Sequence, residues 1–582
     1  MRHRLHIEIN NRKYAFEAVF LAVSIVFCIL CLSIVLRVHG WPYDDDNIWI
    51  KLRTEIYGTQ FRHGNLFPVW SSSDAYGMGS PVLLFYQKLF YYVSGALFVL
   101  LHGAIKKALV ISVGIFMLVG LYGMRFALSV ITKRKLSLVV IPQVLILSNY
   151  SFTDWFMRGD VSEFSAMMIV PWVFYWCLNL IKNRKPSILI VPIFVLLVLA
   201  HNAIAVAATL LVVTSLVVYA YGRWREVVNK ELVVRLALYA VLGLLILSPL
   251  LIAQYKMSKD FDPSVKILQD DGVPPAHYLT LSGYFLTWYA WLQNNSVLNL
   301  QIDYGIWVPI LVIIVFLVLC LLFKDRNPFK RALKYFSDKR TLVFLLGSFL
   351  IYLFLQLGIS KPVYSVLSPL NFLQFPWRLL IFITIAGILV VAYASEWLYR
   401  SLKKDWIVSS FVILWLVSFV LLSPIVRKYG PNYAIISTNQ FSSAILPSYG
   451  GIGEIGTGEY LPKLYTTSGV EINKDQDQAY YNQLFLTNKE GEALNGTCSY
   501  SERPNASFET SNVVMTISCN GAATFALPIT YSRYLQVQQL DNGIYKPYPF
   551  YRLNTDPRAI IRVKNTVTVR VVFPTAAHIL LG

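Results

Sequence analysis

The sequence predicts a polytopic α-helical membrane protein that ends in a β-rich domain. Hydrophobic residues make up 56% of its 582 residues, charged residues only 14%, and the mean hydropathy is +0.53. A soluble domain has charged side chains at nearer a quarter of its positions. Uncharged stretches at 310–323, 341–357 and 379–393 are long enough to cross, or nearly cross, a hydrocarbon layer about 30 Å thick. These observations exclude a large soluble protein.

The basic residues predict how the chain is oriented. The formal net charge is +19, but Lys and Arg gather in short loops between apolar runs. Such loops stay in the cytoplasm, so the positive charge indicates topology and not a nucleic-acid partner. The first apolar run, 15–36, lacks a small-residue cleavage site and follows four basic residues, which predicts a retained signal anchor with the N-terminus inside. The basic loops lie at 133–135, 182–185, 223–225, 324–340 and 400–404.

Residues 1–424 are predicted to form the transmembrane domain. The first extracytoplasmic loop covers 38–80, and the spacing of 47–62 predicts a helix on the membrane surface. Residues 81–130 form either two crossings or one crossing and a re-entrant or interfacial piece, and the second arrangement is preferred because it keeps all basic loops inside. The whole domain then has roughly 11–13 transmembrane helices. The later ones are expected at about 136–150, 164–181, 187–202, 203–221, 232–253, 305–323, 341–357, 378–398 and 406–424.

Residues 425–582 are predicted to form a β-rich domain outside the membrane. They contain no convincing spanning helix and are rich in Gly, Asn, Thr and Ser. Alternating or β-branched runs at 513–517, 534–537 and 566–572 predict strands of a sandwich or jelly roll. Cys498 and Cys519 lie in this polar region, and two cysteines in an extracytoplasmic domain predict one disulfide.

The acidic triplet Asp44-Asp45-Asp46 follows the first helix. It fits either a solvated helix cap or carboxylates that act as a general base or position a cation at the outer membrane surface. The triplet is compatible with a divalent ion but does not require one, and no metal ligands are assigned. The sequence contains no GxxxxGK[ST] phosphate loop, no HExxH zinc site and no nucleophile elbow.

A second polar cluster is predicted at the same face. Asp154, Arg158, Asp160 and Glu163 precede or begin a predicted helix, so the acids fit either helix capping or a functional site. Arginines are usually found on the cytoplasmic side, so Arg158 at the outer face opposes this bias. A phosphate ligand is one reason to keep an arginine there. Arg378 begins another helix, where it either reaches lipid headgroups or binds an anion together with helix amides.

Seven short motifs occur in an order that resembles bacterial GT-C membrane glycosyltransferases of the YfhO-like kind, including relatives called 6-pyruvoyl-tetrahydropterin-synthase-related membrane proteins. One departure concerns Ile50, because the family often has His at that position, and any role of that His does not transfer. The motifs are Asp46, Trp49 and Arg53; Gly64 to Trp70; Tyr76 to Pro81 with Phe85-Tyr86; Arg158-Gly159 with Glu163; His201-Asn202; Gln374 to Arg378; and Glu459 to Pro462.

The resemblance implies an inverting enzyme that moves a sugar, expected to be a hexose, from a polyprenyl-phosphate donor to an envelope glycan such as O-antigen or lipopolysaccharide. It places the protein in a bacterial inner membrane, with a donor-synthesising glycosyltransferase and a flippase as possible partners and no nucleic acid. It implies that Asp46 is the first choice for the base, followed by Asp45 and Asp44, with Asp160 and Glu163 as supporting acids. Arg158, Arg378, Lys88 and Arg53 would hold the donor phosphate, and Trp70, Tyr86, His201, Glu459 and Tyr460 would contact glycan.

Two other functions stay open at this point. A lipid-linked glycan flippase or other transporter would place ionisable residues near the bilayer midplane and often show inverted repeats. An O-antigen polymerase or ligase shares the substrates and the compartment. The sugar, the acceptor, the linkage and the oligomeric state are not specified by the sequence.

Overall fold

The computed structural model divides the chain into two compact units. The first comprises Met1–Lys51, Lys106–Leu244 and Asp271–Ile435, and the second comprises Leu52–Ile105, Leu245–Asp270 and Ile436–Gly582. The residues that the structure describes are 2–37, 40–42, 46–184, 186–221, 230–261, 303–322, 339–373, 375–422, 435–437, 463, 490–501 and 511–581.

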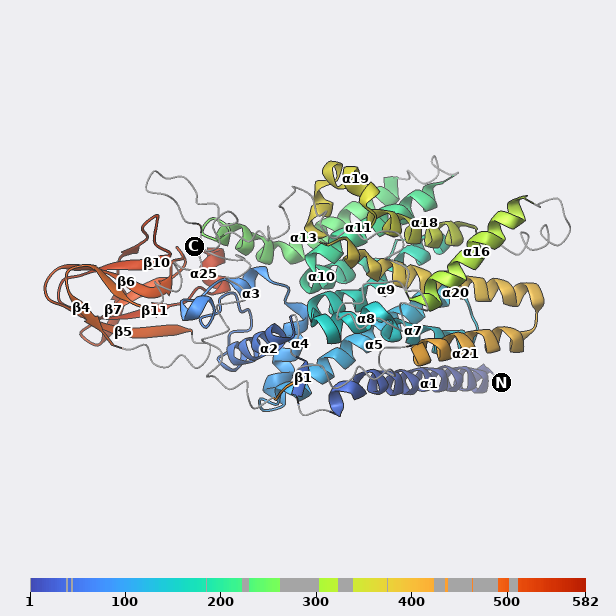
Figure 1. Cartoon of the computed structure of the whole chain (residues 1–582), viewed down its shortest axis with the longest axis horizontal. Helices are drawn as coiled ribbons and strands as arrows, with labels where there is room; N and C mark the ends of the chain where they lie inside the picture. Colours follow the sequence, from blue (N-terminus) through green and yellow to red (C-terminus); the bar gives the residue numbers. More distant parts are fainter. Residues whose placement is uncertain are drawn as a thin grey trace. The chain divides into compact units, whose positions relative to one another are not determined.

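The first unit consists mainly of helices (Figure 1). They form where the sequence has long apolar runs, and most begin and end within a few residues of the predicted bounds. The helices are α1 (Arg2–Leu36), α5 (Ile105–Ile131), α6 (Lys135–Val140), α7 (Val144–Leu147), α8 (Asn149–Phe152), α9 (Val161–Asn183), α10 (Ile190–Ala200), α11 (Asn202–Ala220), α16 (Tyr304–Leu322), α18 (Lys339–Leu355), α19 (Lys361–Val366), α20 (Leu380–Leu402) and α21 (Asp405–Leu422), with a short strand β1 (Gly40–Pro42). Helix α13 (Lys230–Met257) and the short strand β2 (Ile435–Ser437) begin in this unit and end in the second.

Six helices in the described part of the chain are long and apolar enough to cross a membrane. A bent pair, Lys135–Leu147 with Asn149–Arg158, would make a seventh crossing. Shorter apolar helices are also present, among them α10 and α21. A mostly helical fold with several membrane-type helices is therefore confirmed, whereas the predicted total of crossings stays a prediction.

Helices α9 and α20 form the core of the first unit. Within the most apolar window of each, 83% of the residues are buried, whereas only 6% are buried in the corresponding window of α13. Helix α9 packs against α10 and α11, and α20 packs against α16 and α18. The side chains at the start of α9 and α20 are therefore enclosed by protein, although both helices are apolar enough to face lipid.

The segment 136–163 differs from its prediction. The sequence predicts a single helix over about 136–150, before the second polar cluster. The chain instead passes through α6, a 3₁₀ turn (Ile141–Gln143), α7, α8 and a π-helical turn (Thr153–Arg158). The break follows from Ser148, whose extended backbone ends α7 and whose hydroxyl accepts a hydrogen bond from the Ser151 N–H to cap α8. Helical structure thus continues up to the second polar cluster.

The helical part of the second unit includes the start of 81–130, where one crossing and a re-entrant or interfacial piece stay a prediction. Helix α2 (Asn47–Arg62) has the predicted bounds and passes from the first unit into the second. After a 3₁₀ turn (Ala75–Gly77), the expected apolar segment is interrupted between α3 (Val82–Phe85) and α4 (Leu89–Leu100). The 12 residues of α4 span about 18 Å, well short of a hydrocarbon layer of about 30 Å.

The C-terminal part of the second unit contains two antiparallel sheets, with strand orders β3-β6-β10-β9 and β4-β5-β11-β7-β8 (Figure 1). In β5 the buried and exposed side chains alternate, as its sequence pattern predicts. A disulfide joins Cys498 to Cys519, which are directly opposite each other in the β4–β5 ladder. The elements are β3 (Glu492–Asn495), β4 (Cys498–Tyr500), β5 (Asn512–Cys519), β6 (Ala523–Thr530), β7 (Gln536–Asp541), β8 (Ile544–Pro547), β9 (Phe550–Tyr551), β10 (Arg558–Val563), β11 (Thr566–Val572) and α25 (Ala576–Leu581).

Replacing Cys498 and Cys519 together by Ser should lower the free energy of unfolding of the β-rich region by about 3 kcal/mol. The bond closes a loop with a sequence separation of 21, and a loop of that size restricts the unfolded chain to this extent. Thermal unfolding of the purified full chain measures the change. Reductant should shift the wild-type midpoint by a similar amount and leave the variant unchanged; equal midpoints for oxidised wild type and variant would contradict the expectation.

Candidate functional site

A short turn before α9 brings the second polar cluster together. Gly159 has a left-handed backbone (φ 70°), which lets the π-helical turn end and α9 start within two residues. Asp160 is the N-cap of α9, and its carboxylate accepts a hydrogen bond from the Glu163 N–H at 3.0 Å. The helix-capping interpretation is therefore confirmed for Asp160, and the same turn directs its neighbours into the interior of the first unit.

Arg158 lies among three carboxylates. Its Nη1 donates to Asp154 Oδ1 at 2.8 Å and to Glu163 Oε2 at 3.2 Å, and its Nη2 lies 3.5 Å from Asp160 Oδ2. The side chains of Asp154 and Glu163 are completely buried. Buried charges of this kind are costly unless they are paired, so the arginine and the acids require one another.

Arg378 enters the same cluster from the 3₁₀ turn (Pro376–Leu379) that begins α20. Its Nε donates to Glu163 Oε2 at 3.0 Å, its Nη1 donates to the Leu373 carbonyl at 3.0 Å, and its Nη2 lies 3.8 Å from Asp160 Oδ2. One oxygen of Glu163 therefore accepts from two arginines, while the hydroxyl of Tyr150 donates to the other. Three acids and two guanidinium groups leave the cluster with one formal negative charge in excess.

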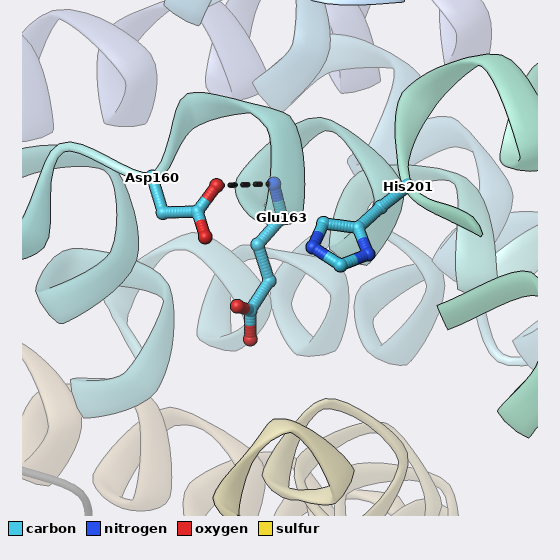
Figure 2. Close-up of side chains that lie close together, drawn as sticks. All are labelled: Asp160, Glu163 and His201. Carbon is cyan, nitrogen blue, oxygen red and sulfur yellow. Dashed lines mark hydrogen bonds between the residues drawn. The ribbon is translucent and has the colours of Figure 1, made fainter. Parts of the chain in front are cut away.

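His201 completes the cluster from the break between α10 and α11. Its extended backbone ends the first helix and begins the second, and its side chain is only 3% exposed. Figure 2 shows the imidazole beside Glu163, with Asp160 on the other side of the Glu163 backbone. Burial opposes the ionised form of Asp160, but Arg158 and other neighbours outweigh it and lower the pKa of this carboxyl to about 2.

Asp46 reaches the cluster through its backbone. Its N–H donates to the Arg158 carbonyl at 2.8 Å, and its own carbonyl accepts from Trp49 and Ile50 at the start of α2. The acid that ends the first-loop triplet is thus held next to the second polar cluster, and its side chain is half-buried. Asp44 and Asp45 lie outside the described residues.

Other predicted site residues belong to the second unit and have structural contacts there. Lys88 is buried, and its Nζ donates to the carbonyls of Leu83, Leu84 and Tyr86 at 2.9, 2.8 and 3.3 Å. The three donors of a lysine ammonium are therefore already used at the end of α3, which gives Lys88 a helix-capping role.

The remaining predicted residues also pack against protein. The Arg53 guanidinium lies 3.6 Å from the centre of the Tyr86 ring, a cation–π contact that occupies both side chains. Trp70 is 2% exposed and stacks on Phe573 of the β-rich region, with ring centres 6.1 Å apart. Packing against Phe573 therefore accounts for the presence of a tryptophan at position 70. Glu459 and Tyr460 lie outside the described residues.

Two residues of the site were missed from the sequence. Tyr150 contacts Glu163, but a tyrosine at the end of an apolar run gives no functional signal. Asp303 is buried, and both its oxygens accept from the Asn149 N–H, at 3.0 and 3.1 Å. It thereby fixes the start of α8, and burial raises the pKa of its carboxyl to about 7. The sequence signal that could have indicated Asp303 is its position as an isolated acid directly before the apolar run at 305–323.

No model of a known protein family matches the sequence, and no curated protein is significantly similar to it. The chemistry must therefore be argued from the cluster itself. Its carboxylates can accept a proton or bind a cation, and its arginines can bind an anion once they exchange a carboxylate for it.

Replacing Glu163 by Gln should destabilise the first unit by about 3–5 kcal/mol, because two buried guanidinium groups lose their shared carboxylate. Denaturant unfolding followed by tryptophan fluorescence measures the change. Glu231→Gln is the matched control: Glu231 is 62% exposed and pairs with Arg235 within one helix, so its loss should cost well under about 1 kcal/mol. Similar losses for the two variants would contradict the structural role of Glu163.

Lys88→Met should cost about 1–3 kcal/mol of stability, because the carbonyls at the end of α3 lose their donors in a buried setting. Thermal unfolding measures this loss. If Lys88 instead serves a donor phosphate, the variant would keep its stability and bind an anionic lipid more weakly. Lys106→Met, on a half-buried lysine, is a control for loss of a lysine charge.

Proposed function

We propose that the protein is a GT-C-like glycosyltransferase that moves a sugar from a polyprenyl-phosphate donor to an envelope glycan, such as O-antigen or lipopolysaccharide, on the outer face of a bacterial inner membrane. The proposal includes a transmembrane domain of roughly 11–13 helices and a β-rich domain outside the membrane. One observation carries it: residues 46, 158–163, 201 and 378, which the motif order singles out, converge on one cluster.

The roles follow from what sugar transfer requires. Inverting transfer needs a base beside the attacking hydroxyl and a site for the charge of the leaving phosphate. Asp46 is the proposed base, because it is more accessible than the acids of the cluster and is held next to them. Asp160 and Glu163 are proposed as positioning residues, since both contact the arginines.

Arg158 and Arg378 are the proposed ligands of the donor phosphate. Each already contacts Glu163 and lies near Asp160, so an incoming phosphate has to replace one of these carboxylates. Arginine suits this exchange, because its planar fork binds carboxylate and phosphate with the same geometry.

A transporter of lipid-linked glycans is the second candidate, and one observation favours it. Asp154 and Glu163 are completely buried between helices, which is how transporters hold the charges that line a path. Such a protein would move the lipid-linked sugar without forming a glycosidic bond.

Sugar transfer by cells that express wild type or Asp46→Asn tests the proposal. Mass spectrometry of the envelope glycan should show a hexose-sized increment with wild type and lose it with the variant. Asp541→Asn, on an exposed ion pair of the β-rich region, should retain the increment.

Purified protein separates the competing functions. With a monosaccharide–polyprenyl phosphate, a transferase forms a new glycosidic bond, a transporter forms none, and a polymerase requires an oligosaccharide donor. Persistence of the increment in Asp46→Asn would remove Asp46 from the base role, and no increment with wild type would favour transport.

A further inference from the structure

Asp160, Glu163 and His201 form a compact set of metal-type donors. We propose that these three side chains bind a divalent transition-metal ion of the Mn²⁺ or Zn²⁺ class. One donor atom from each residue lies within 4.8 Å of the other two, and all three residues are buried. Donors that share a metal with bonds of about 2.1 Å lie at most about 4.2 Å apart, so small side-chain rotations close the set.

His201 supplies the nitrogen donor of the set. Its side chain is 3% exposed, and Nδ1 is buried without a hydrogen-bond partner in the described part of the chain. Figure 2 shows the imidazole with Nε2 turned towards Glu163 and Nδ1 on the far side of the ring, so Nε2 is the donor that the set uses. A buried ring nitrogen without a partner, such as Nδ1, costs about 1–3 kcal/mol.

The two carboxylates retain acceptor capacity despite the arginines. A carboxylate offers about four lone-pair sites. Glu163 uses three of them, for Tyr150, Arg158 and Arg378. Asp160 uses one for the Glu163 N–H, and its contacts with the two arginines are longer, at 3.5 and 3.8 Å. Each acid therefore retains acceptor capacity for a cation.

Acids also outnumber guanidinium groups around the donor set. Asp154, Asp160 and Glu163 face Arg158 and Arg378. A divalent ion would add positive charge to this cluster, which would favour an anionic ligand nearby. Without the ion, the same residues form a self-contained ion-pair network, and the experiment distinguishes these two descriptions.

The donor set selects the class of metal. Two carboxylates and one imidazole suit Mn²⁺ or Zn²⁺, whereas Ca²⁺ prefers six to eight oxygen ligands and Mg²⁺ is held mainly by oxygen and water. Three protein ligands leave at least one coordination position open. The proposed metal site is inferred from this donor geometry alone and does not require that the protein transfers sugar.

Metal binding to the purified full chain tests the proposal. The protein, carrying a tag without histidine, is stripped with chelator in lipid nanodiscs and titrated with Mn²⁺, with free Mn²⁺ followed by electron paramagnetic resonance. Wild type should bind about one equivalent, and His201→Gln should bind roughly tenfold more weakly or worse. His102→Gln is the matched control, since His102 is exposed, and it should bind like wild type.

Two further measurements cover the case in which His201→Gln does not fold. Pulsed resonance spectra of bound Mn²⁺ in wild type should show nitrogen coupling from one imidazole. Saturating metal should also raise the thermal midpoint of wild type, because a ligand that binds the folded state stabilises it. Absence of binding to wild type, or bound Mn²⁺ without nitrogen coupling, would overturn the proposal. No sugar donor is present, so failure of the proposed transferase activity would not affect these results.

Discussion

The first unit depends on the carboxylate of Glu163. This side chain is completely buried on the first turn of α9, and it joins Arg158 from the preceding turn, Arg378 from the start of α20 and Tyr150 from α8. The central helices α9 and α20 are therefore connected by charge at one end and by apolar packing along their length. Apolar packing alone would permit many sliding positions of one helix along another, whereas a buried ion pair requires one.

The same arrangement explains why so many polar residues are tolerated inside an apolar helical unit. Each charge of the cluster has an opposite charge within 4 Å, and Asp160 also caps a helix. Full pairing reduces the cost of burial, but it does not make the network more stabilising than a well-packed apolar core would be. The polar cluster is therefore better explained by a functional role than by stability, which is why the proposed chemistry is placed there.

Much of the fold could be predicted from the sequence, because burial in lipid or protein leaves long apolar runs that are easy to recognise. The bounds of α2, α9 and α20, the strands around β5 and β11, and the Cys498–Cys519 pairing follow from such local patterns. The turn around Gly159 could not be predicted, because its π-helical geometry depends on how Ser148 and Asp160 cap neighbouring segments. The role of Lys88 could not be predicted either. It caps α3 through three backbone carbonyls, and no sequence pattern shows that these carbonyls lie near its side chain.

The candidate site was predicted as separate motifs, and the structure supplies the reason that they belong together. Asp46, Arg158 and Arg378 lie far apart in the sequence, but the Asp46 N–H bonds the Arg158 carbonyl and both arginines contact Glu163. Any ligand that changes the pairing of one arginine must therefore change the charge felt by the others. An anionic headgroup and a divalent cation would both weaken the same carboxylate–arginine pairs, since the first competes with the acids for the arginines and the second competes with the arginines for the acids. Binding of the cation would loosen the hold of the acids on the arginines, and the two ligands would favour each other's binding.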